Sequence, residues 1–201
     1  SDTAMVLAAG FGQRMRPLSE ATPKPLLKIK GRAMLDMAID HLKDVGIRRV
    51  VVNGHYLADQ VEEHLKTRTD MEVIFSYEDK IMDTGGGVKK VLEYFDGGPF
   101  LLLGGDMPCM DDGQPTLKTL IDAWDAQKMD ELMLLYPTTK AKGFNPEHGD
   151  FVMEEGGRIW RKDAPFPRAY VWLSAQIVKP QLYDQIDRDV FSNNEIFDLC
   201  E

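Results

Sequence analysis

Cysteine and long apolar runs are both scarce in this sequence. Its 201 residues include two cysteines, Cys109 and Cys200, without CxxC spacing, which excludes a disulfide framework and predicts reduced thiols. No apolar run reaches the roughly eighteen residues that a membrane span needs. The N-terminus also lacks the basic region and apolar core of a signal peptide. We therefore expect a cytoplasmic protein with no membrane partner.

Several catalytic motifs are missing as well. The four histidines have no zinc-ligand spacing, and no GxSxG turn occurs, so zinc hydrolysis and serine acyl transfer have no support. A GxGxxG dinucleotide motif fails because Met15 stands at its last glycine, which leaves a Rossmann dehydrogenase as a weak alternative. A P-loop kinase is excluded because no GxxxxGK[ST] occurs. The histidines concerned are His41, His55, His64 and His148.

Basic residues are outnumbered. With 24 Lys and Arg against 33 Asp and Glu, the net charge is -9, whereas a nucleic-acid partner requires a broad basic face. The composition, 43% hydrophobic and 28% charged, is that of a single globular domain over residues 1–201. We expect a small anionic substrate and no nucleic acid, and the sequence leaves the oligomeric state open.

One loop departs from this acidic balance. The segment LAAGFGQRMRPLSEATPKPL, residues 7–26, follows an apolar strand and brings Arg14, Arg16 and Lys24 together with only Glu20 against them. Small residues at its start let the backbone turn sharply and approach a ligand. Backbone N–H groups and arginine forks both suit phosphate oxygens, so the loop predicts a polyphosphate site, with a solvated glycine turn as the alternative. Those small residues are Ala8, Ala9, Gly10 and Gly12.

The same segment resembles the N-terminal signature of the sugar-1-phosphate nucleotidylyltransferases, LAAGxGxRxxPLTxxxPKPL. Only Ser19 departs from it, where threonine is usual. The resemblance implies that the backbone of Leu7, Ala8, Ala9, Gly10 and Gly12 faces the nucleobase. It also implies that Arg14 holds the triphosphate and that Lys24 contacts phosphate at the reaction centre. The sequence looks most similar to N-acetylmuramate 1-phosphate uridylyltransferases and mannose-1-phosphate guanylyltransferases.

A second glycine cluster follows at Asp83-Thr84-Gly85-Gly86-Gly87. Apolar residues at helical spacing come next, so the glycines should lie at or just before the start of a helix. Three glycines in a row lose backbone entropy on ordering, which favours a place where something approaches the chain, although a flexible loop is the alternative. By resemblance, Gly85 and Gly86 are expected beside the base and ribose.

Asp106 ends the apolar strand Pro99 to Leu103 in a Gly-Gly-Asp turn. A carboxylate there is ordinarily a cap or turn residue. At the same sheet edge as the basic loop, it is placed to hold a hard cation against phosphates, and it resembles the family's metal site. We expect Asp106 to bind Mg²⁺.

Strand and helix patterns alternate over residues 1–137. They predict an α/β fold with a doubly wound, mainly parallel, Rossmann-like sheet of the nucleotide-diphospho-sugar transferase type. The second half, 138–201, should add a β-hairpin extension around Gly156 and Gly157 and a strand from Tyr170 to Val178. We assign 1–137 to the nucleotide and 138–201 to the sugar, although the hairpin could equally be structural cover.

Three residues of the second half are candidates for sugar binding. Gly149 and Asp150 belong to a GDF triplet that resembles part of the family's sugar side, and Lys162 stands near the position of its sugar-phosphate lysine, without the usual EKP context. The family also carries a second metal-binding Asp in a WxDVGTP-like segment, which nothing before Glu201 matches. We therefore expect a natural polypeptide that is longer, or an incomplete metal site.

The reaction that the resemblance implies is transfer of a nucleotidyl group from a nucleoside triphosphate, with UTP favoured, to a sugar 1-phosphate, releasing pyrophosphate. Catalysis by Arg14, Lys24 and Asp106 with Mg²⁺ would rest on positive charge rather than on an acid/base pair. The alternative is a regulatory module that binds a nucleotide without turnover, which the missing second Asp favours.

Overall fold

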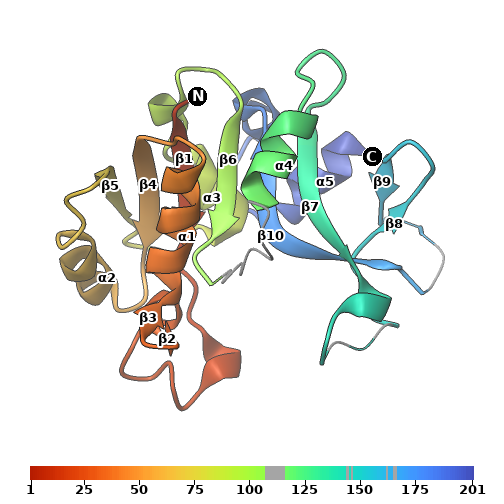
Figure 1. Ribbon diagram of the computed structural model, residues 1–201. Coiled ribbons are helices and arrows are strands. Elements are labelled where there is room, and N and C mark those ends of the chain that lie inside the picture. The colour runs from red at the N-terminus through yellow and green to blue at the C-terminus, as the bar shows by residue number, and fades with distance from the viewer. Residues whose placement is uncertain (107–115, 144, 146, 162, 165–166) are drawn as a thin grey trace.

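A computed structural model describes residues 1–106, 116–143, 145, 147–161, 163–164 and 167–201. Its centre is a six-stranded sheet with the order β5-β4-β1-β6-β10-β7 (Figure 1). The strands are β1 (Thr3–Leu7), β4 (Arg49–Gly54), β5 (Glu72–Tyr77), β6 (Phe100–Gly104), β7 (Glu131–Pro137) and β10 (Tyr170–Val178).

Strands β5, β4, β1 and β6 run parallel, as the alternating pattern predicted. Met5 of β1 pairs with Val51 of β4 and with Leu102 of β6. The last strand of the sequence, β10, then enters antiparallel between β6 and β7. The sheet is therefore mainly parallel with an antiparallel insertion, which confirms the predicted fold class.

Five α-helices and several short elements connect the described strands. The helices are α1 (Met34–Asp44), α2 (Ala58–Leu65), α3 (Asp83–Lys89), α4 (Thr116–Ala123) and α5 (Asn194–Cys200). The 3-10 helices are η1 (Gln13–Met15), η2 (Lys24–Leu26), η3 (Leu92–Phe95), η4 (Thr138–Lys140) and η5 (Pro180–Gln185). Short strand pairs are β2 (Lys28–Ile29) with β3 (Arg32–Ala33), and β8 (Val152–Met153) with β9 (Ile159–Trp160).

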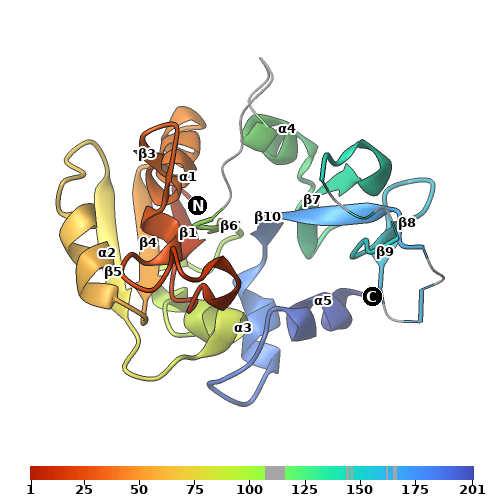
Figure 2. The same cartoon turned by 90° about the horizontal axis from the view of Figure 1, so that it is seen from below.

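The sheet is covered on both faces because alternate residues of its strands point to opposite sides. One core joins Ala4 and Val6 of β1 to the apolar faces of α1, α2 and α4. The other core joins Met5 to α3, η3, η5 and α5. Figure 2 shows α1 and α4 on one side of the sheet and α3 and α5 on the other.

Helix α1 illustrates how the sequence specifies this packing. Leu35, Ile39 and Leu42 recur at helical spacing and are fully buried, and Gly46 ends the segment with a φ of 89° that favours glycine. Each such buried aliphatic side chain contributes roughly 1.5–3 kcal/mol. Helix α1 therefore packs against β1, the strand that the first loop follows.

The second half has a smaller core of its own. It buries three side chains together: Phe151, Met133 of β7 and Phe197 of α5. The ring of Trp172, on β10, packs edge-on to Phe197, with the ring centroids 5.2 Å apart. The predicted hairpin forms as β8 and β9, and a bridge between Phe151 and Tyr170 attaches it to β10. Among the helices of the described residues, none combines the length and apolarity of a membrane span.

Candidate active site

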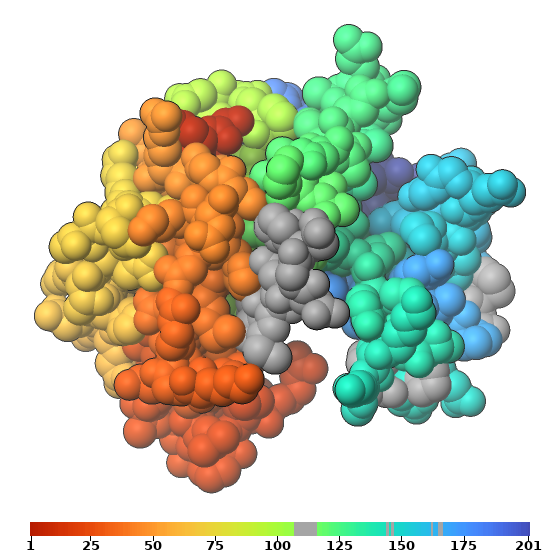
Figure 3. All heavy atoms as spheres, in the orientation of Figure 1, coloured from red at the N-terminus to blue at the C-terminus, as the bar shows by residue number. Residues whose placement is uncertain are grey.

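A cavity of about 490 Å³ lies at the carboxyl ends of β1, β4 and β6. The first loop, from Leu7 to Met15, forms one wall together with Lys24 and Pro25. Asn53 and the start of α3 form a second wall, and the end of β6, Asp106 and two residues of β10 form the third. The surface is hollowed between the first loop and the region of η4 (Figure 3). This is the edge where open α/β sheets bind ligands.

The first loop is braced from within. Gly12 has a left-handed φ of 62°, and the hydroxyl of the buried Ser19 donates a 2.7 Å hydrogen bond to the Gly12 carbonyl. A side chain at Gly12 would begin 3.1 Å from the Cβ atoms of Ser19 and Lys24. The loop therefore folds back on itself, which places the exposed Arg14 of η1 and Lys24 on the same cavity.

Side-chain contacts attach this loop to α2 and to the segment between β4 and α2. The ring of Phe11, on the cavity wall, meets His55 edge-on at 5.4 Å and lies 5.8 Å from Tyr56. The Tyr56 hydroxyl donates to the Glu20 carbonyl at 3.1 Å, and the Gln60 amide donates to the Ala21 carbonyl at 3.0 Å. The loop is thus supported along most of its length, although much of it is exposed.

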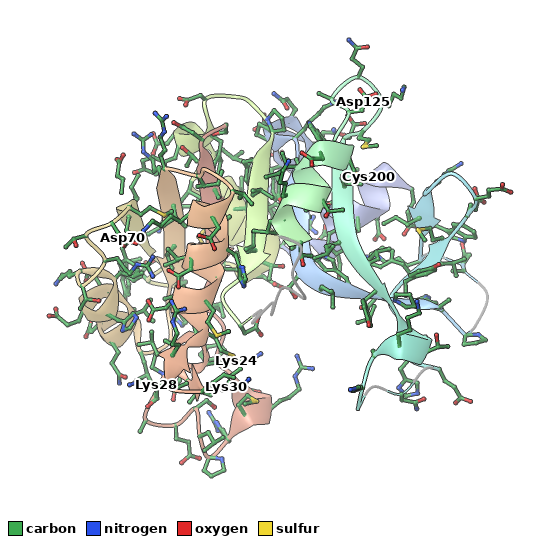
Figure 4. The ribbon with its side chains drawn as sticks, in the orientation of Figure 1. Lys24, Lys28, Lys30, Asp70, Asp125 and Cys200 are labelled. Carbon is green, nitrogen blue, oxygen red and sulfur yellow. The ribbon has the colours of Figure 1, made fainter. Side chains whose placement is uncertain are left out.

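Lys24 and Asp106 meet at the cavity. The ammonium of Lys24 donates to Oδ2 of Asp106, and their side chains are 29% and 36% exposed. Figure 4 shows Lys24 at the end of the sheet below α1. The N–H of Gly105 donates to the Leu7 carbonyl at 2.8 Å, so the turn after β6 packs directly on the end of β1. The predicted convergence of the loop and the Gly-Gly-Asp turn is therefore present in the structure.

Asp106 suits a hard cation by its chemistry and its surroundings. A side chain at Gly104 would begin 2.8 Å from Oδ1 of Asp106 and 3.0 Å from Cβ of Ser174, so a larger residue there would require the carboxylate to shift. No group of three or more His, Cys, Asp or Glu side chains able to hold a metal occurs among the described residues. Mg²⁺ commonly binds through one or two carboxylates, with substrate phosphates and water completing its shell, so one aspartate fits that mode.

The second glycine cluster lies at the start of a helix, as expected, but its surroundings differ from those expected. Gly85 and Gly86 are buried in the first turn of α3, and both N–H groups donate to the Phe191 carbonyl, at 2.9 and 3.1 Å. A side chain at Gly86 would begin 2.0 Å from the carbonyl oxygen of Asp189. What approaches these two glycines is thus the protein's own chain. Asp83 and Thr84 reach the cavity wall, and Gly85 and Gly86 do not line it.

The candidates in the second half lie beside the cavity or outside the described residues. Gly149 is buried against Arg168, whose carbonyl oxygen is 2.0 Å from where a Cβ would stand. Asp150 accepts the backbone N–H of Trp172 at 2.9 Å, and Trp172 lines the cavity. Asp150 therefore positions a wall residue without lining the cavity itself. Lys162 falls outside the described residues.

Sequence reasoning missed two residues of β10 and one of β4. Trp172 and Ser174 line the cavity at an irregularity in the pairing of β10 with β7, and Ser174 has a φ of 56°, which is uncommon for a residue other than glycine. Nothing in the apolar run of β10 distinguishes these positions. Asn53 was identifiable in principle, because it lies next to the last residue of a parallel strand at the ligand-binding edge.

Comparisons with known proteins identify relatives of this chain. The model of the family described as Nucleotidyl transferase matches residues 3–158. An N-acetylmuramate alpha-1-phosphate uridylyltransferase from Caulobacter vibrioides is 35% identical over 184 residues, which cover 89% of this chain and 76% of that protein. A mannose-1-phosphate guanylyltransferase catalytic subunit beta from Drosophila pseudoobscura pseudoobscura is 35% identical over 111 residues, 53% of this chain and 30% of the relative.

The fold has solved counterparts. The crystal structure of HddC from Yersinia pseudotuberculosis superposes with a TM-score of 0.75 at 21% identity, covering 95% of this chain and 82% of that one. The family match spans the first loop, the start of α3 and the turn of Asp106, which together build most of the cavity. Because the family model matches residues 3–158 and the uridylyltransferase relative aligns with 89% of this chain, the chain belongs to the nucleotidyl transferase family.

Proposed function

We propose that the protein transfers a nucleotidyl group from a nucleoside triphosphate to a sugar 1-phosphate and releases pyrophosphate. The observation that carries this proposal is the convergence of Arg14, Lys24 and Asp106 with a glycine-containing backbone loop on one cavity. Two cations and a carboxylate suit a reaction between two phosphate groups better than they suit acid/base chemistry.

In the proposed reaction, a phosphate oxygen of the sugar 1-phosphate attacks the α-phosphorus of the triphosphate in line. A new P–O bond forms as the bond to the β-phosphate oxygen breaks, and pyrophosphate leaves with the bonding electron pair. Arg14, exposed on η1, binds the triphosphate and the departing pyrophosphate. Lys24 offsets the repulsion between the two phosphates that must approach each other.

Asp106 is the proposed holder of Mg²⁺. Bound there, the cation would neutralise phosphate charge and help to orient the triphosphate. Lys24 has a carboxylate partner in the structure, and phosphate oxygens are an equivalent acceptor for its ammonium. Entry of substrate and cation therefore lets both residues exchange one charged partner for another without leaving either charge unpaired.

The backbone of Leu7, Ala8, Ala9, Gly10 and Gly12 is proposed to face the nucleobase, with Gly85 and Gly86 acting only indirectly, by fixing α3. We favour UTP because a relative that aligns with 89% of this chain is a uridylyltransferase. Trp172 and Ser174 form the wall on the side of residues 138–201. We propose that the sugar lies along this wall, with Asp150 orienting Trp172 and Lys162 near the sugar phosphate.

Pyrophosphate release tests the proposal. UTP, GTP, CTP and ATP are each combined with Mg²⁺ and a panel of sugar 1-phosphates that begins with N-acetylmuramate 1-phosphate. We expect turnover that is greatest with UTP and requires both substrates. Triphosphate binding without turnover in any combination would favour the regulatory module instead.

The role of Asp106 has its own test. Asp106→Asn keeps the shape of the side chain and removes its charge, so we expect activity to fall and the Mg²⁺ concentration for half-maximal rate to rise. Asp122→Asn, on the exposed face of α4, is the control and should leave both unchanged. An Asp106→Asn enzyme with normal activity and unaltered Mg²⁺ dependence would remove this residue from the proposed site.

A further inference from the structure

We propose that Asn53 and Glu78 are positioning residues that together set the geometry of the nucleotide side of the cavity. They form a buried amide–carboxylate pair that joins the peptide following β1 to the residue preceding α3. This inference rests on the proposed function, since it concerns how the same site binds its triphosphate.

Asn53 is placed to act on the first loop. It lies near the end of β4, beside the end of β1, and it is 2% exposed while still contributing to the cavity wall. Its Oδ1 accepts the N–H of Ala8 at 2.8 Å, and its Nδ2 donates to Oε1 of Glu78 at 2.7 Å. The amide therefore orients the first peptide of the loop.

Glu78 extends the connection to α3. It is fully buried, and its Oε2 accepts the N–H of Met82 at 3.1 Å, one residue before the Asp83 and Thr84 that line the cavity. Its own N–H donates to the Gly54 carbonyl at 2.8 Å, which fixes the residue to the end of β4. Both carboxylate oxygens thus serve as acceptors for neutral N–H groups on two separate segments.

The third glycine of the second cluster makes room for the pair. A side chain at Gly87 would begin 2.7 Å from Nδ2 of Asn53 and 2.8 Å from Oε1 of Glu78. Both distances are shorter than a normal contact with a carbon atom, so a larger residue at position 87 would require the Asn53 or Glu78 side chain to shift. Burial of a carboxylate is costly, and an apolar pair would fill this space more cheaply, so the arrangement points to a requirement for geometry.

The proposed consequence concerns binding of the triphosphate more than the chemical step. Asn53 occupies the Ala8 N–H, so the peptide between Leu7 and Ala8 has one orientation before the ligand arrives. Lys24 and Asp106 contact each other, not Asn53 or Glu78, so we expect them to keep their positions when the Asn53–Glu78 pair is broken. Loss of preorganisation in a binding wall raises KM for the triphosphate while kcat stays close to normal.

A reciprocal exchange of the two side chains tests this. Asn53→Asp alone places two carboxylates against each other with no donor between them. Glu78→Gln alone places the new amide N–H against another donor, which is either the Met82 N–H or the Asn53 side-chain amide. In the double variant the amide N–H at position 78 donates to the carboxylate at position 53, and the amide oxygen at position 78 accepts the Met82 N–H. All the hydrogen bonds are then restored with reversed direction.

We expect each single variant to raise KM for UTP by about tenfold or more, which corresponds to the loss of one buried charge-assisted hydrogen bond. The double variant should return KM to within about threefold of the wild type, and kcat should change by less than about threefold throughout. Wild-type KM in both single variants, or a double variant as impaired as the two singles combined, would overturn the proposal.

Controls separate positioning from general stability. Gln176→Glu alters another buried amide, which donates to Oε1 of Glu131 at 2.5 Å away from the cavity wall, and it should lower the melting temperature without changing KM. Gly87→Ala, which crowds the pair, should raise KM as the single exchanges do. If a single exchange does not fold, the double variant and Gly87→Ala still decide the matter.

Failure of the proposed function is distinguishable from failure of this inference. A wild-type chain that releases no pyrophosphate contradicts the proposed function, and titration calorimetry with UTP then measures the same exchanges by binding alone. A wild-type chain that turns over while neither single exchange affects KM contradicts the positioning role of Asn53 and Glu78 and leaves the proposed function standing.

Discussion

Lys24 and Asp106, 82 positions apart in the chain, are ion-paired at the cavity. Lys24 comes from the loop that follows β1, and Asp106 from the turn that follows β6, so the pair exists because these parallel strands are neighbours and end at one edge. Both side chains are about a third exposed, and pairs of this kind contribute only about 0–1 kcal/mol to stability. The pair therefore costs little to separate when phosphate enters.

Lys24→Met tests what the ammonium does. Pro23 and Pro25 stiffen the backbone on either side of Lys24, so its charge is presented with little loss of entropy. If that charge acts mainly in the transition state, kcat should fall by roughly a hundredfold or more while KM for the triphosphate changes little. Steady-state kinetics measures both constants. Lys28→Met is the control, since Lys28 is exposed on β2 and does not line the cavity.

A Lys24→Met enzyme with near-normal kcat and only a raised KM would give a different answer. The lysine would then bind the ground state and the transition state equally, and it would have no special part in the chemical step.

Arg14→Ala should weaken triphosphate binding without affecting folding. Arg14 is exposed on η1 and lines the cavity, so its removal takes away a phosphate ligand and no core contact. We expect kcat/KM to fall by about tenfold to a hundredfold and the melting temperature to stay the same. Arg16→Ala, two positions along the same loop but not on the cavity wall, is the matched control. Equal effects of the two substitutions would point to the loop's overall charge instead of a contact by Arg14.

The sequence was informative wherever a signal is local. Three features could be predicted: the first loop, the alternating strands and the acidic turn after β6. Each depends on residues that are close together in the sequence, and parallel strands bring their carboxyl ends to one edge of the sheet. The roles of Gly85 and Gly86 could not, since their neighbours Asp189 and Phe191 lie more than a hundred positions later. The insertion of β10 between β6 and β7 is equally non-local.

Gly10 and Gly86 are glycine for two different structural reasons. A side chain at Gly10 would meet nothing within 4 Å, yet the residue lines the cavity, whereas one at Gly86 would begin 2.0 Å from the Asp189 carbonyl oxygen. Gly10→Ala should therefore leave the melting temperature unchanged and raise KM for the triphosphate, because only a ligand needs that space. Gly86→Ala should destabilise the fold by roughly 1–3 kcal/mol, measured by denaturant unfolding. A stable Gly86→Ala protein with impaired binding would instead place that glycine at the ligand.

Glu131 gives the protein a pH-dependent stability remote from the cavity. It lies at the start of β7, and its Oε1 accepts the Gln176 amide at 2.5 Å. Desolvation on burial raises the pKa of Glu131 from 4.5 to about 8, although hydrogen bonds, including that from Gln176, oppose the shift. Between these values the folded chain keeps a proton that the unfolded chain has lost, so stability should fall as pH rises from about 4.5 to about 8.

Glu131→Gln keeps the shape and cannot ionise. We expect its melting temperature to exceed that of the wild type near pH 8 and to match it near pH 4.5, as measured by thermal unfolding across that range. Asp70→Asn supplies a control of opposite sign, because a hydrogen bond from Lys43 lowers the pKa of Asp70 from 3.8 to about 2. That substitution should destabilise the protein above about pH 4, with the difference vanishing as pH falls towards 2. If Glu131→Gln instead shifts the melting temperature equally at every pH, the Glu131 carboxyl is not protonated in the folded protein, and its burial contributes nothing to the pH dependence.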